Sequence, residues 1–126
     1  MGTILKVSCS KCDYTKDLYC GCGISGCNIN MIQNRFSDKI FSEFQDYKNN
    51  NMISTYIMTN EICYCPDCKE IKTVAVLTYT LKNSEIIKRV STCSNCGGSV
   101  EFLNHDTLSC PKCGTPLEKE DCGMWD

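Results

Sequence analysis

The sequence predicts a small α+β protein, mainly β, whose elements are held together through cysteine side chains. Three observations predict this fold class: four C-x-x-C pairs, two alternating segments that form a β-hairpin, and one amphipathic helical segment. Of the 126 residues, 13 are cysteine and one is histidine, and aromatic residues make up only 9%. Such a composition is typical of scaffolds organised by sulfur chemistry rather than by one large hydrophobic core.

Eight of the cysteines form the four C-x-x-C pairs. The odd cysteine total, and a first segment without the apolar length of an export signal, favour a reducing, cytoplasmic location in which disulfides rarely persist. Two intervening residues let a tight turn direct both sulfurs at one ion, and two such turns supply the four thiolates that Zn²⁺ prefers in closed structural sites. The spacing therefore predicts two zinc ions, bound by Cys9, Cys12, Cys65, Cys68, Cys93, Cys96, Cys110 and Cys113.

Two other chemistries use the same spacing. A redox dithiol requires a helix that starts at the first cysteine, whereas Pro66 and Pro111 lie inside turns that extended segments surround. Iron is harder to separate from zinc, because tetrahedral sulfur sets suit both metals. Residues 93–98 and 110–114 also resemble the two knuckles of rubredoxin, although the gap between them is shorter here. Iron is therefore the less favoured alternative.

The residue after each second cysteine carries a wider resemblance. Gly97 and Gly114 stand where a left-handed turn closes a metal-binding knuckle, and Asp13 and Lys69 depart from that pattern. The chain resembles the zinc-ribbon superfamily, in which two knuckles at the tips of β-hairpins clamp one ion. Its order of knuckle, glycine loop, helix, further knuckles and a tail ending in Trp-Asp is also similar to small bacterial multi-ribbon proteins of unknown function. This resemblance implies the fold and the metal, and no activity.

The sequence leaves two ways to pair the knuckles. Sequential pairing joins residues 9–12 to 65–68 and residues 93–96 to 110–113, and we favour it because closing short loops costs less chain entropy. Nested pairing joins 65–68 to 93–96 and 9–12 to 110–113, and it is supported by a hairpin that ends at the third knuckle. The same eight cysteines are ligands in both schemes.

Sequential pairing also sets the expected domain organisation. It predicts an N-terminal ribbon with an inserted loop and helix (1–72), a β-hairpin connector (73–92), a short C-terminal ribbon (93–117) and an acidic tail (118–126). The helix is expected at about 37–49, because Ser37 can cap it. The residues at helical spacing on its expected core face are Phe36, Ile40, Phe41, Phe44 and Tyr47. The connector is expected because residues 73–81 alternate like a strand, 82–84 turn and 85–91 return.

Three further cysteines, Cys20, Cys22 and Cys27, lie in a glycine-rich loop. With Cys63 or Cys122 they could hold a third metal or act as reactive thiols. The alternative is that they are free or packed thiols of no special chemistry. The sequence does not decide between these uses.

The sequence favours binding over catalysis. No Ser/His/Asp set, H-E-x-x-H or Walker motif is present, and four thiolates leave a zinc ion no open position for water, so we expect no enzyme. The formal net charge of −2 becomes about −6 when eight thiols ionise around two Zn²⁺ ions. We therefore expect a protein-interaction or scaffold module, in which Trp125 either anchors a partner or packs back onto the ribbons.

Two alternative functions remain open. A nucleic-acid-associated ribbon of the transcription or translation type would use the basic hairpin at residues 69–92, whose net charge is +3. A rubredoxin-like redox or metal-handling protein would use the loop cysteines. No apolar run reaches the roughly 18 residues of a membrane span, so we expect no membrane association.

Overall fold

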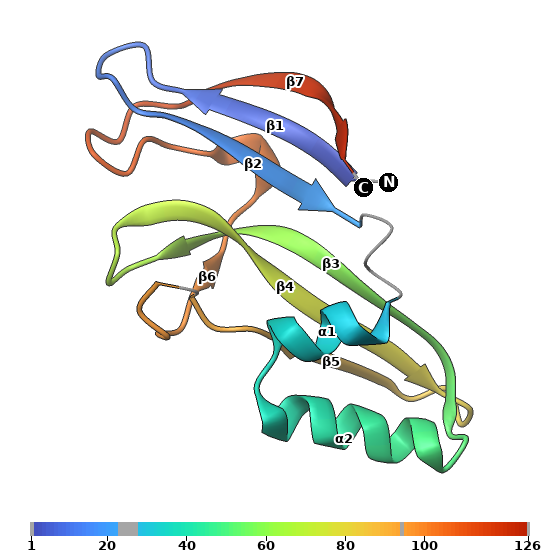
Figure 1. Cartoon of the computed structure of the whole chain (residues 1–126). Helices are drawn as coiled ribbons and strands as arrows, with labels where there is room; N and C mark the ends of the chain where they lie inside the picture. Colours follow the sequence, from blue (N-terminus) through green and yellow to red (C-terminus); the bar gives the residue numbers. More distant parts are fainter. Residues whose placement is uncertain (1, 23–27, 94, 126) are drawn as a thin grey trace.

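A computed structural model describes residues 2–22, 28–93 and 95–125 of the chain (Figure 1). The expected fold class is confirmed, because the described residues form an antiparallel sheet, two helices and two cysteine clusters. The elements in chain order are β1 (Gly2–Ser8), β2 (Thr15–Gly21), α1 (Ile29–Arg35), α2 (Asp38–Asn49), β3 (Ile53–Cys65), β4 (Glu70–Leu81), β5 (Ile86–Val90), β6 (Glu101–Phe102), the 3₁₀ turn η2 (His105–Thr107) and β7 (Glu118–Trp125). Neither helix has the length and hydrophobicity that a bilayer span requires.

The sheet consists of two halves with a weak junction. Its strand order is β5-β4-β3-β2-β1-β7, and β6 pairs with β3. Strands β3 and β4 pair along their whole length, whereas β2 and β3 meet only at Gly21 and Asn60. Figure 1 shows β7, β1 and β2 at one end of the sheet and both helices beside β3, β4 and β5. Each half therefore needs its own core.

The core of the helical half confirms the expected role of α2. Ser37 caps the helix, because its side chain accepts a hydrogen bond from the Ile40 amide at 3.3 Å. Phe44 is fully buried, and its ring lies 5.2 Å from both the Tyr56 and the Tyr79 ring in edge-on geometry. The predicted hairpin is also confirmed, since β4 and β5 pair antiparallel, but its third strand, β3, was not predicted.

The core of the other half lies beside a cysteine cluster. Leu5 and Val7 of β1 and Leu18 of β2 are buried there together with Leu108 and Leu117, which flank the last knuckle. Cys110 belongs to the same buried cluster. This half therefore has a small apolar core whose edge is formed by metal-ligand candidates.

The expected acidic tail is a strand of the sheet. β7 pairs with β1 from Gly2–Trp125 to Ser8–Glu118, with a bulge beside Ile4 and Leu5. It is the last strand on its side of the sheet, and its residues from Glu118 to Met124 are exposed. Residues 118–125 are thus a structured edge and part of the same half as β1.

Candidate metal centres

The structure gathers the eight expected ligands into two groups of four sulfurs. Within each group, all four Sγ atoms lie within 4.8 Å of one another. The groups are named here site A, formed by Cys9, Cys12, Cys110 and Cys113, and site B, formed by Cys65, Cys68, Cys93 and Cys96.

The sulfur spacing fits zinc in both sites. A Zn–S bond of about 2.3 Å gives a tetrahedron with sulfur–sulfur edges of about 3.8 Å. In site A, Cys12 Sγ lies 3.4 Å from Cys110 Sγ and 3.9 Å from Cys113 Sγ. In site B, Cys68 Sγ lies 3.8 Å from Cys93 Sγ. These edges are far longer than a disulfide bond of about 2.05 Å, and all eight cysteines are free thiols.

The favoured sequential pairing of the knuckles is wrong, and the nested pairing is correct. Cys65 and Cys68 lie at the turn between β3 and β4, and β5 returns along β4 to deliver Cys93 to the same place. Cys9 and Cys12 lie between β1 and β2, and the β1–β7 pairing holds the last knuckle beside them. The entropy argument counted only loop lengths, whereas the strand ladders offset the cost of the long closure.

The turns after the cysteines largely follow the expected pattern. Gly97 and Gly114 have φ angles of 72° and 77°, in the left-handed region that glycine adopts without strain. Their amides donate 2.8 Å hydrogen bonds to the carbonyl groups of Cys93 and Cys110. Lys69 also adopts a left-handed φ of 53°, so this knuckle closes in the same way despite its side chain. Three of the four knuckles therefore share one turn.

Each site contains one thiol whose ionisation is promoted by a neighbour. In site B, the Lys72 ammonium donates to Cys93 Sγ at 2.9 Å and lowers the pKa of Cys93 to about 5. In site A, the Thr115 hydroxyl lies 3.3 Å from Cys113 Sγ and lowers the pKa of Cys113 to about 6. Since zinc binds thiolates, these contacts favour the ligand form of the side chains.

Lys72 is the functional residue that the sequence analysis missed. It was counted in the basic hairpin, but its side chain is only 8% exposed and its charge faces a sulfur. A buried charge is stable only when it is paired, and a zinc ion with four thiolates carries a formal charge of −2. The alternation of strand β4, which places Lys72 opposite Cys63 of β3, is the signal that could have revealed its inward position.

Replacing Lys72 with methionine is expected to weaken zinc binding at site B by about 10- to 100-fold, the usual effect of losing a partner of a metal ligand. Competition with a coloured chelator would measure this as earlier release of one of the two zinc ions. Lys82→Met, in the exposed β4–β5 turn, is the matched control and should release both ions like the unmodified protein. Equal behaviour of the two variants would contradict the role of Lys72.

The remaining cysteines form no third ligand group among the residues that the structure describes. Cys20 is half-buried on β2, Cys63 is buried in β3 and Cys122 is exposed on β7. Cys22 is half-buried just after β2, and Cys27 lies outside the described residues. A third metal that involves Cys27 stays a prediction.

Trp125 packs back onto the sheet. Its indole N–H donates a 2.9 Å hydrogen bond to the Cys20 carbonyl group, and its ring meets Tyr19 edge-on at 6.1 Å. The side chain is half-buried, so its expected role as a free anchor for a partner is replaced by the alternative, a contact within the fold.

Two four-sulfur sites, each built from two knuckles on a small antiparallel sheet, define a multi-zinc-ribbon protein. In agreement, residues 89–116 match the family model of a zinc ribbon domain. The matched segment contains one knuckle of site B and one of site A. The comparisons with curated proteins and with solved structures gave no match.

Proposed function

We propose that the protein is a cytoplasmic, structural-zinc interaction module whose partner is another protein. The observation that carries the proposal is strand β7, an exposed acidic strand at the edge of the sheet. Zinc supports this role as a fold-stabilising crosslink, because four thiolates around each ion leave no position for a reacting water.

The edge of β7 offers both backbone groups and charge. One side of the strand pairs with β1, and no other described strand covers the opposite side. Unpaired edge groups can pair with an extended segment of another protein, which adds a strand to the sheet. Glu118, Glu120 and Asp121 oppose a single lysine on this strand, so the partner that fits is a basic, extended segment.

The same structure weakens the nucleic-acid alternative for the basic hairpin. Lys72 is buried against Cys93, Arg89 pairs with Glu43 at 2.9 Å, and Lys88 lies 3.8 Å from Glu61. Binding to a nucleic-acid backbone requires several available cations. Since three of the five cations of this hairpin face acidic groups or a thiol, an acidic protein-binding edge is the better supported function.

A designed peptide of alternating lysine and valine residues is the probe for this proposal. We expect it to bind the zinc-loaded protein, to weaken with added salt, and to shift the backbone NMR signals of β7. Glu120→Lys should weaken binding severalfold through lost charge complementarity. Glu85→Lys, an exposed glutamate in the β4–β5 turn, makes the same charge change and should leave binding nearly unchanged. Equal weakening by both variants, or signal shifts away from β7, would reject β7 as the interaction surface.

A further inference from the structure

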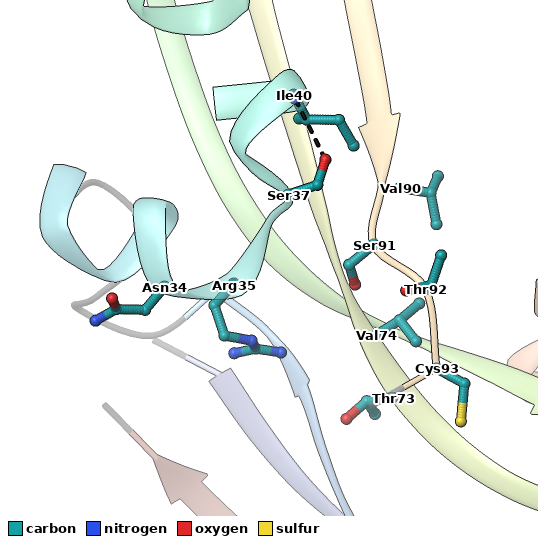
Figure 2. A pocket seen from close by; sticks show the side chains of 10 residues that line it. All are labelled: Asn34, Arg35, Ser37, Ile40, Thr73, Val74, Val90, Ser91, Thr92 and Cys93. Atoms are coloured by element: carbon teal, nitrogen blue, oxygen red, sulfur yellow. Dashed lines mark hydrogen bonds between the residues drawn. The ribbon is translucent and has the colours of Figure 1, made fainter. Parts of the chain in front are cut away.

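A cavity of about 450 Å³ lies between the α1–α2 corner and the sheet, next to site B (Figure 2). One wall comes from the end of α1 and the start of α2, and the other comes from β4 and the segment after β5. Its volume falls within the usual range for small-molecule sites. The segment that forms part of its wall ends at Cys93, so zinc at site B would fix this wall in place.

The polar side chains around this cavity are mainly hydrogen-bond donors. Six of the ten lining residues are polar, and none carries a carboxylate: Asn34, Arg35, Ser37, Thr73, Ser91 and Thr92. Two of the hydroxyl oxygens already accept hydrogen bonds within the fold, from the amides of Ile40 and Ala75. The hydrogens of those hydroxyls are therefore the groups that remain to bind an acceptor.

Arg35 supplies the charge. Its Nη2 atom donates to the Asn60 side chain at 3.2 Å, which holds the guanidinium at the cavity. Within the described ranges, no carboxylate lies at ion-pair distance from Arg35, in contrast to Arg89, which pairs with Glu43. Partial desolvation lowers the pKa of Arg35, as expected for a cation whose lost hydration no anion replaces. Figure 2 shows its side chain extending from α1 toward β4.

We propose that this cavity binds a phosphate group, with Arg35 as the residue that neutralises its charge. Guanidinium recognises phosphate oxygens through paired, charge-assisted hydrogen bonds, and hydroxyl donors can satisfy the remaining oxygens. The phosphate group belongs to either a free nucleotide or the backbone of a single-stranded nucleic acid. This site is separate from β7 and goes beyond the proposed protein-binding role.

The test uses the zinc-loaded full chain and three probes: inorganic phosphate, a nucleoside 5′-monophosphate and a short single-stranded oligonucleotide. Calorimetry should detect binding, and the NMR signals of Ser37, Thr73 and Thr92 should shift. Arg35→Gln should weaken phosphate binding about tenfold or more. Lys39→Gln removes one exposed positive charge from α2, outside the cavity lining, and should change it little. Both variants should retain two zinc ions, which shows that their folds are intact.

The probes separate the two sources of the phosphate. Tighter binding of the mononucleotide assigns the cavity to a free nucleotide, and tighter binding of the oligonucleotide assigns it to a nucleic-acid backbone. Absence of binding by all three probes would overturn the proposal. Equal weakening by Arg35→Gln and Lys39→Gln would overturn it as well, because that result indicates attraction to overall charge rather than a built site.

Discussion

Removal of both zinc ions is expected to unfold most of the chain. Structural zinc contributes roughly 10–16 kcal/mol of apparent binding free energy per site at neutral pH. A domain of this size has a net stability of about 5–15 kcal/mol, so losing even one site can exceed the whole reserve. The consequence should be strongest for the half formed by β7, β1 and β2, because Cys110 is part of its small buried core.

Far-ultraviolet circular dichroism during titration with a chelator would measure this loss of structure, and zinc should restore the spectrum. The same chelator saturated with zinc beforehand is the control, since it cannot remove metal from the protein. A spectrum that stays unchanged after complete metal removal would show that the two hydrophobic cores suffice alone. That outcome would contradict the assignment of both sites as structural.

The second large effect concerns which cysteines share an ion. In the nested arrangement, Cys12→Ser/Cys110→Ser damages site A alone, so the variant should retain one tightly bound zinc ion. Cys93→Ser/Cys110→Ser damages both sites and should retain none. Sequential pairing reverses the second result, because Cys93 and Cys110 would then share one ion. Elemental analysis of the purified variants gives the stoichiometry directly.

Cys122→Ser is the control for these double variants, because Cys122 lies on β7 outside both groups and should leave two zinc ions bound. The experiment also addresses the zinc ribbon domain match, which spans one knuckle of each site. One zinc retained by the Cys93/Cys110 variant and none by the Cys12/Cys110 variant would contradict the nested structure. The two variants therefore give opposite readings for the two pairings.

Local spacing predicted the ligands and several elements, because these depend on residues close together in the chain. The two-residue gap in each pair predicts a knuckle, the Ser37 cap begins α2, and the alternation of residues 73–81 gives β4. Strand β3 escaped prediction, although it spans 13 residues. Its exposed and buried positions do not alternate regularly, since one end faces the helices and the other carries Cys63 and Cys65.

The partners of these elements could not be predicted in the same way. Knuckle pairing depends on the register between distant strands, such as β1 with β7, and loop length is a poor guide once such ladders form. Lys72 was assigned to the solvent because most lysines are exposed, and only the position of Cys93 reveals its partner. Arg35 likewise became a candidate binding residue only when the fold placed it beside hydroxyl groups from β4 and the segment after β5.

The nested arrangement has a consequence for the order of events during synthesis. Cys68 and Cys93 are 25 positions apart, whereas Cys12 and Cys110 are 98 positions apart. A chain emerging from the ribosome therefore presents a complete inner clasp well before its outer one, and Cys9 and Cys12 must wait for Cys110 and Cys113 to be translated. The outer metal then acts as the final lock, securing the earliest hairpin to one of the last segments made.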